Sequence, residues 1–391
     1  MDNDEQKNNS VEGFKSTTIP QGRLLPGIHG LRGIAALAVV LFHLVHIADI
    51  AAPLSLGLIG RDFGKGVHLF FVLSAFSLMH STEHTMHRPT WTTEYFIKRF
   101  FRIAPLYYTV MTGMVLWQFL TLHTWTVDFQ TVLLNVTFTF GFAPWSGIVW
   151  AGWTVGVEML FYAILPVLLL TVRTMSATVA LVVISIFVTF AADSVLHVHY
   201  DYTISQYKFN WAYFSFPANL CFFAMGIYAF RVARQIPRVS LMMRWVIPAF
   251  SVVLLGALMF RGYYHQPKGL GHGILLLWSI GFVALCVWQS KRPNRWIANK
   301  VFEYLGERSY SVYLLHPVVI FLLKNPLQFI YGRLSQILGA YAFFVCAALA
   351  IVPLLILSEV TYRWIEVPGI RIGRRIIGGL RQRSENSIKL V

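Results

Sequence analysis

Long apolar stretches follow one another through the chain and leave few architectures open to it. About 20 apolar residues are needed for a helix to cross the hydrocarbon core of a membrane. Segment 131–143 is too short for this, and the uncharged stretch 145–153 after it suits a re-entrant or interfacial segment. We therefore predict an all-α polytopic membrane protein, a bundle of ten transmembrane helices plus a short re-entrant or interfacial segment near 131–143. The predicted spans lie near residues 33–51, 66–80, 103–122, 155–172, 177–196, 209–230, 246–260, 271–288, 309–323 and 339–360.

The distribution of basic residues supports ten crossings. Cytoplasmic loops of membrane proteins are enriched in Lys and Arg. With ten spans and both termini inside, the inner segments hold 25 of the 32 Lys and Arg residues. Eleven spans would instead place the basic clusters 231–244, 288–308 and 361–391 outside. We therefore expect cytoplasmic N- and C-termini, and the net charge of +15 is explained by contact with anionic membrane lipid, without nucleic acid as a partner.

The polar ends of the chain divide it into three parts. Residues 1–25 lack the basic-then-apolar order of a signal peptide and are predicted to be a disordered cytoplasmic tail. Residues 26–370 form the transmembrane domain, and residues 371–391 form a basic cytoplasmic tail. The three cysteines each lie alone in an apolar run, so we expect neither a metal site nor a disulfide.

Arg32 and His43 lie eleven residues apart in the first apolar stretch. Eleven residues make about three helical turns, so both side chains share a face, with the imidazole about 16 Å beyond the guanidinium. Ionisable groups at this depth are costly and usually mark a function. His43 is either satisfied by a neighbouring helix or acts as a general base.

A basic cluster precedes Pro105 in the inner loop YFIKRFFRIAPLYY. Arg99 and Arg102 share a helix face, and paired guanidinium groups suit phosphate recognition, with Lys98 beside them. The alternative interpretation is an ordinary basic anchor at the inner membrane surface.

Glu158 lies inside the span that follows Trp153, four residues before Tyr162. A carboxylate in this position must be paired, hydrogen-bonded, protonated or hydrated. His43 is a candidate partner, because a carboxylate beside an imidazole fixes its tautomer and stabilises the imidazolium. A structural tie between helices is the alternative.

His68 and His316 are further histidines within or beside predicted spans. His316 precedes Pro317, whose missing N–H frees a carbonyl and allows a kink. Each histidine either lines a cavity or plays a structural part.

Six motifs in this order resemble the integral-membrane acyltransferase 3 family: GIHGLRGIAALAVVLFHL, GVHLFFVLSAFSL, KRFFRIAPLYY, WTVGVEMLFY, SYSVYLLHP and YRWIEVPG. The resemblance covers residues 26–370. It implies ten spans, often in a bacterial cytoplasmic (inner) membrane, and transfer of acyl groups, often acetyl from acetyl-CoA, to hydroxyls of glycans or lipid-linked sugars. The sequence differs from the family pattern at Ala75, where the second motif usually has glycine.

The resemblance also implies roles for individual residues. It makes His43 catalytic and places Arg32 and Glu158 with it in the catalytic set. It associates Arg99 and Arg102 with the binding of acyl-CoA. The family's late Tyr-Ser and His-Pro pattern falls on Ser309, Tyr310 and His316. We expect substrate contacts from Trp153, Tyr162, His68, Tyr310 and His316.

The sequence thus predicts a membrane O-acyltransferase that uses acetyl-CoA, with no metal. His43 would take the proton of an acceptor hydroxyl on a cell-surface polysaccharide or a lipid-linked glycan. Tyrosines in the outer loops 193–208 and 261–270 are candidates for stacking on sugars or for interfacial anchors. The main alternative is a proton-coupled transporter that uses the same His, Glu and Arg set, although no inverted repeat of these patterns is visible.

Overall fold

The structure is a computed structural model that describes residues 25–125, 127–200, 203–204, 207–208, 211–264 and 272–389. The predicted tail 1–25 therefore lies outside the described residues except for Leu25. The side chains of the outer-loop tyrosines in 193–208 and 261–270 also lie outside them.

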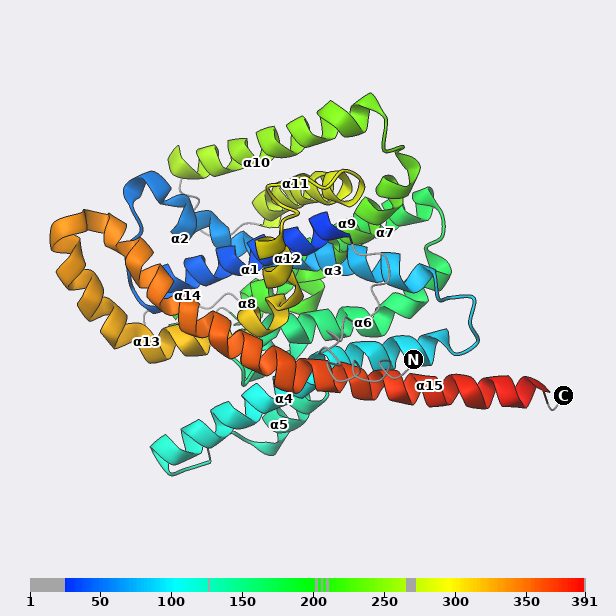
Figure 1. Ribbon diagram of the computed structural model, residues 1–391, viewed down its shortest axis with the longest axis horizontal. Coiled ribbons are helices and arrows are strands. Elements are labelled where there is room, and N and C mark those ends of the chain that lie inside the picture. The colour runs from blue at the N-terminus through cyan, green and yellow to red at the C-terminus, as the bar shows by residue number, and fades with distance from the viewer. Residues whose placement is uncertain are drawn as a thin grey trace, which may run out of the picture.

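The chain is helical almost throughout (Figure 1). The helices are α1 (Pro26–Ile47), α2 (Leu58–Asp62), α3 (Gly66–Glu83), α4 (Trp91–Leu122), α5 (Phe129–Val136), α6 (Trp153–Thr171), α7 (Met175–Tyr200), α8 (Trp211–Phe214), α9 (Phe216–Gln235), α10 (Ile247–Tyr264), α11 (His272–Lys291), α12 (Lys300–Glu307), α13 (Ser309–Leu338), α14 (Ala342–Thr361) and α15 (Val367–Lys389). Two short antiparallel strands, β1 (Thr203–Ile204) and β2 (Tyr207–Lys208), connect α7 to α8.

Nine helical segments of the described chain are long and apolar enough to cross a membrane. The last of them, Ser309–Arg383, includes two apolar helices, α13 and α14, which fold back on each other at the 3-10 turn Gly339–Tyr341. Counted separately, these two helices would make ten candidate spans. Segment 131–143 contains the end of the eight-residue α5 and a 3-10 turn, so it does not span, as predicted.

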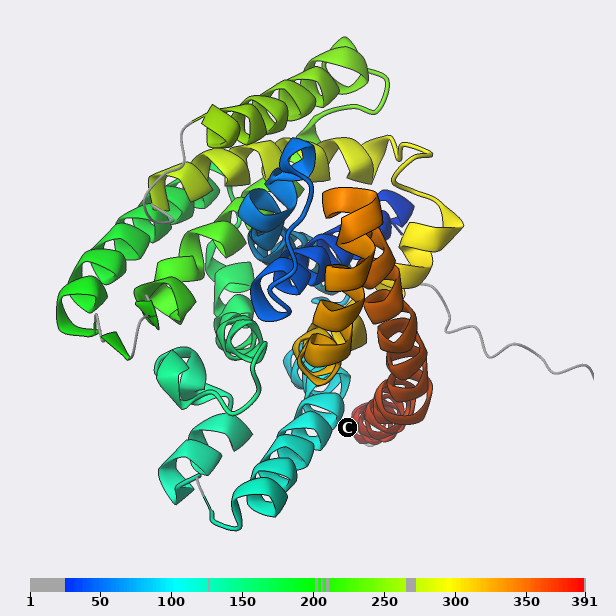
Figure 2. The same cartoon turned by 90° about the vertical axis from the view of Figure 1, so that its left-hand side faces the viewer.

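Helices α1 and α3 lie in the middle of the bundle (Figures 1 and 2). They pack on each other, α3 packs on α9 and α11, and α1 packs on α12 and α13. Helices α7, α10 and α14 lie at the periphery and expose apolar side chains such as Phe187, Val253 and Ile356. These exposed side chains suit contact with lipid tails.

The predicted basic tail, residues 371–391, is helical as far as Lys389. It forms α15, which continues from α14 through a π-helical turn and packs along α4. Arg381 on α15 forms a bidentate ion pair with the buried carboxylate of Glu94 on α4, with N–O distances of 2.6 and 2.7 Å.

Glycines let α1 and α12 approach each other closely. A Cβ atom on Gly30 would lie 2.1 Å from the carbonyl oxygen of Ile297, and one on Gly306 would lie 2.0 Å from that of His29. Both neighbours are backbone atoms, which cannot rotate away. The GIHGLRG motif therefore determines how closely the beginning of α1 packs against α12 and the residues before it.

Gly30→Ala is expected to destabilise the protein by about 1–3 kcal/mol, the usual cost of overpacking. Gly113→Ala on α4 is the matched control, because nothing lies within 4 Å of the added methyl group. That substitution should be neutral or stabilising, since alanine favours helix over glycine. Thermal unfolding in detergent measures both, and equal midpoints for the two variants would contradict the close packing.

Ala75, where the second motif of the family usually has glycine, packs against a glycine on the neighbouring helix α9. Ala75 is fully buried, and it faces Gly226 on α9, where an added Cβ would lie 2.7 Å from the Ala75 Cβ and 2.3 Å from the Val72 carbonyl oxygen. At Ala75, α3 therefore approaches another helix closely, and the glycine that permits this approach lies on α9.

Candidate active site

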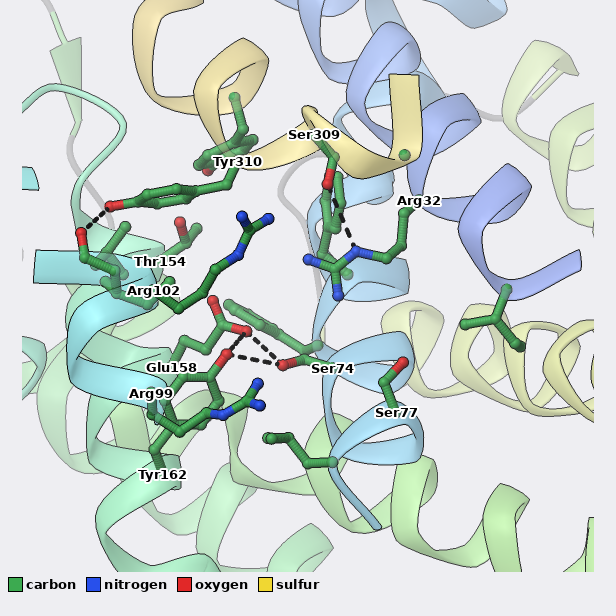
Figure 3. Close-up of a pocket in the computed structure, with 18 of the residues that line it drawn as sticks. Arg32, Ser74, Ser77, Arg99, Arg102, Thr154, Glu158, Tyr162, Ser309 and Tyr310 are labelled. Carbon is green, nitrogen blue, oxygen red and sulfur yellow. Dashed lines mark hydrogen bonds between the residues drawn. The ribbon is translucent and has the colours of Figure 1, made fainter. Parts of the chain in front are cut away.

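A cavity of about 300 Å³ lies between α1, α3, α4, α6 and α13 (Figure 3). Its polar wall brings together side chains that are far apart in the sequence. The polar side chains that line it include Arg32, Ser74, Arg99, Arg102, Glu158, Tyr162, Ser309 and Tyr310. Six of the predicted site residues, on the four helices α1, α4, α6 and α13, thus share one cavity.

The three arginines of the cavity differ in what they bind. The Arg32 Nε donates a long hydrogen bond of 3.5 Å to the hydroxyl of Ser309. The Nε of Arg99 is buried and has no hydrogen-bond partner among the described residues. Arg102 is held by the carboxylate of Glu366. Arg99 is therefore the guanidinium best placed to bind an anion from outside the protein.

Glu158 lies in the cavity wall, but its partner is not the predicted one. Its carboxylate accepts short hydrogen bonds from the hydroxyls of Ser74 on α3 and Tyr162 on α6 (Figure 3). The two hydroxyls also lie 3.2 Å apart. The expected pairing of Glu158 with His43 is wrong, because Glu158 faces the arginine cavity and α1 contributes only its first turns to that cavity.

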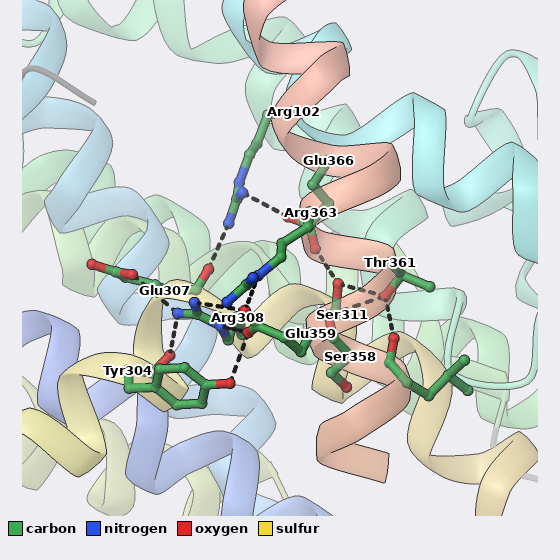
Figure 4. Close-up of polar contacts among 11 residues, drawn as sticks. Arg102, Tyr304, Glu307, Arg308, Ser311, Ser358, Glu359, Thr361, Arg363 and Glu366 are labelled. Carbon is green, nitrogen blue, oxygen red and sulfur yellow. Dashed lines mark hydrogen bonds and ion pairs between the residues drawn. The ribbon is translucent and has the colours of Figure 1, made fainter. Parts of the chain in front are cut away.

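Glu366 is a site residue that the sequence analysis missed. The π-helical turn Tyr362–Glu366 directs its side chain inward, where it is fully buried (Figure 4). The carboxylate accepts a hydrogen bond of 2.6 Å from Arg102 Nη1 and a short one from the Ser311 hydroxyl. Arg102 also donates to the Glu307 carbonyl at 3.3 Å. The signal was present in the YRWIEVPG motif, as an acid at the end of an apolar run, but its partner lies 264 residues away.

His43 lies farther along α1 and pairs with His316 of α13. His316 Nε2 is 3.0 Å from His43 Nδ1, and His316 Nδ1 is 2.5 Å from the carbonyl oxygen of Tyr313. A carbonyl only accepts, so His316 Nδ1 carries the proton and its Nε2 accepts from His43 Nδ1, which also reaches the Val39 carbonyl at 3.0 Å. In the neutral pair, this leaves the lone pair of His43 on Nε2, as a general base requires.

Two aromatic rings separate the histidine pair from the arginine cavity. Phe70 and Tyr313 line the cavity with their ring centroids 5.8 Å apart, and the Tyr313 centroid is 5.5 Å from that of His316. On the other side, the Arg32 guanidinium lies 5.9 Å from the Phe70 ring. The eleven-residue spacing thus places Arg32 in the cavity and His43 beyond its end.

Two further predicted substrate contacts are not in the cavity. His68 is buried on α3 among the rings of Phe71, Tyr213 and Phe222. Trp153 packs against Phe71, Tyr213 and Phe214. Neither residue lines the cavity, and both pack among aromatic rings. Tyr310 does line it, while its hydroxyl donates to the Ile103 carbonyl at 2.8 Å.

A second cavity of about 310 Å³ adjoins the first between α4 and α15. Both cavities share Arg99 and Arg102, and the second adds Lys98 and Arg374. The amine of Lys98 lies 3.5 Å from the Glu94 carboxylate, which Arg381 also binds. The predicted basic cluster is thus brought together and extended by a cation from α15.

Comparisons with known proteins agree with these observations. A family model described as an acyltransferase domain, Acyl_transf_3, matches residues 25–357. No curated protein and no solved structure gives a significant match. The match covers most of the chain and includes Arg32, His43, Arg99, Glu158 and His316. The chain therefore belongs to the acyltransferase 3 family, and a membrane acyltransferase is the activity that this membership supports.

Proposed function

We propose that this protein transfers an acetyl group from acetyl-CoA to a hydroxyl of a cell-surface polysaccharide or a lipid-linked glycan. One observation carries the proposal: a histidine pair, whose hydrogen bonds leave His43 Nε2 unprotonated in the neutral state, lies next to Tyr313 in the wall of a cavity lined by three arginines. We place the protein in a bacterial inner membrane, with the two basic cavities toward the cytoplasm, where acyl-CoA is found.

The basic cavities suit the donor. Coenzyme A carries several phosphate charges, and guanidinium groups bind phosphates through paired charge-assisted hydrogen bonds. Arg99 supplies a buried donor without a partner among the described residues, and Lys98 and Arg374 line the adjoining cavity. With the phosphates there, the pantetheine arm would lead the thioester along the first cavity toward Tyr313 and the histidine pair.

The histidine pair supplies the base. As the acceptor hydroxyl attacks the thioester carbonyl, His43 Nε2 takes its proton, the C–O bond forms and the C–S bond breaks. The proton then passes from His43 to the departing CoA thiolate. His316 accepts the hydrogen bond from His43 Nδ1 and so holds the ring in the reactive tautomer. His43 is the catalytic residue in this scheme and His316 is a positioning residue.

Glu158 serves the donor side of the site in this proposal. Its negative charge lies near Arg32 and Tyr162 in the cavity. Hydrogen bonds from Ser74 and Tyr162 hold the carboxylate in one position. Glu158 thus offsets part of the cationic charge in the cavity.

Release of CoA from acetyl-CoA by the purified protein in nanodiscs tests the function. We expect release that depends on an added surface-glycan extract, with the acetyl group recovered on the glycan. The family match argues against the alternative of a proton-coupled transporter. Absence of acetyl-CoA binding, together with proton flux in proteoliposomes, would overturn the proposal in favour of that alternative.

A further inference from the structure

A polar groove of about 610 Å³ lies at the connection between α4 and α5. That connection lies away from α15 (Figure 1). It is open to the surface and is lined by the backbone of 146–148 and by two exposed indole rings. The side chains that line it include Gln118, Asp128, Gln130, Thr131, Trp145 and Trp150. None of the lining residues is Lys or Arg.

Hydrogen bonds of one buried side chain, Asn135, hold the walls of the groove in place. Asn135 is fully buried at the end of α5. Its amide nitrogen donates to the carbonyls of Thr131 at 2.8 Å and Ser146 at 2.6 Å. Its amide oxygen accepts from the Tyr107 hydroxyl at 2.6 Å and from the Ile148 backbone N–H at 3.1 Å. The groove is therefore preformed, because the bonds to Ser146 and Ile148 join its two sides and the bond from Tyr107 ties them to α4.

The groove adjoins the helix that carries His316. The Trp150 ring packs edge-on against Phe321 of α13, with centroids 4.8 Å apart. Phe321 lies five residues after His316, about 7.5 Å along the helix axis and about 140° around it, so the two side chains lie on different faces of α13. In the predicted topology this is the outer end of the bundle, opposite the basic cavities.

We propose that this groove binds the acceptor glycan at the outer end of the bundle, beside the helix that carries His316. The inference rests on the proposed function and names where the second substrate binds. Indole rings present flat faces that stack on the C–H faces of sugars, with a polar edge that stays hydrated. Side-chain amides and a carboxylate supply the donors and acceptors for sugar hydroxyls.

The same lining argues against a phospholipid head group as the occupant. A phosphate is bound best by cationic side chains, and among the described residues the one ionisable side chain that lines the groove is the acidic Asp128. Asp128 also caps α5, because it accepts from the Thr131 N–H at 2.7 Å. The ligand class that fits is therefore a neutral, hydroxyl-rich sugar chain.

Binding of sugars without donor tests this inference apart from catalysis. The protein in nanodiscs is titrated with maltohexaose, cellohexaose and chitohexaose, followed by saturation-transfer NMR. We expect the wild type to bind at least one of these probes. Trp145→Ala and Gln130→Ala should each weaken that binding about tenfold, or about 1.4 kcal/mol.

Trp125→Ala is the matched control, because Trp125 is an exposed tryptophan after α4 that does not line the groove. It should leave sugar binding unchanged. An equal loss in Trp125→Ala would show that the tryptophans act only as interfacial anchors and would overturn the proposal. It would also be overturned if no probe bound the wild type, or if the groove variants bound as the wild type does. Acetyl-CoA binding and CoA release, measured on the same samples, report separately whether the acyltransferase function holds.

Discussion

Replacing His43 by alanine is expected to lower the rate of acetyl transfer about 10²–10⁴-fold, the usual contribution of a general base. An alcohol is a weak nucleophile at neutral pH, and His43 Nε2 is the nitrogen left free by the hydrogen bonds of the histidine pair. Acetyl-CoA binding should be nearly unchanged, because His43 does not line the arginine cavity. Acceptor-dependent CoA release measures the rate, and equilibrium binding of acetyl-CoA measures the affinity.

His46→Ala provides the matched control for this substitution. His46 lies one turn farther along α1, is exposed, and bonds through Nε2 to the Gly60 carbonyl at 2.8 Å. Its replacement should leave the rate within a few-fold of the wild type. If a well-folded His43→Ala protein keeps the wild-type rate, His43 has a structural part only, and the base must be sought elsewhere.

Replacing Arg99 by alanine is expected to raise the Michaelis constant for acetyl-CoA by about ten- to a hundredfold. A charge-assisted hydrogen bond contributes about 1.5–3 kcal/mol, and the buried Nε of Arg99 has no partner of its own to lose among the described residues. The protein should therefore lose donor affinity and little stability. Steady-state kinetics at varied acetyl-CoA, with thermal unfolding on the same preparation, separates the two effects.

Replacing Arg99 tests phosphate binding more directly than replacing its neighbour Arg102. Arg102 neutralises the fully buried Glu366, so Arg102→Ala would leave an uncompensated charge at a cost of about 3–5 kcal/mol. Arg173→Ala, at an exposed basic residue that lines neither basic cavity, controls for the loss of one positive charge from the protein. Unchanged donor affinity in Arg99→Ala would refute its role in binding the phosphates.

The sequence alone determined the class of the protein and most of its helices. Lengths of apolar runs depend on local composition and on the thickness of a bilayer, so the long apolar helices and the short α5 can be predicted without tertiary contacts. Arg32, Arg99 and Glu158 were identifiable as candidates because ionisable groups are rare in such surroundings. Their presence in one cavity agrees with that reasoning.

Only the tertiary structure decided which of these side chains are partners. The pairing of His43 with His316 joins residues 273 positions apart, and that of Arg102 with Glu366 joins residues 264 apart. The predicted pairing of His43 with Glu158 was wrong, since helical spacing gives the direction of a side chain on its own helix but not the identity of the helix opposite. The groove around Trp145 likewise depends on Asn135 and its four hydrogen bonds, because loop segments take their shape from long-range contacts that no local pattern encodes.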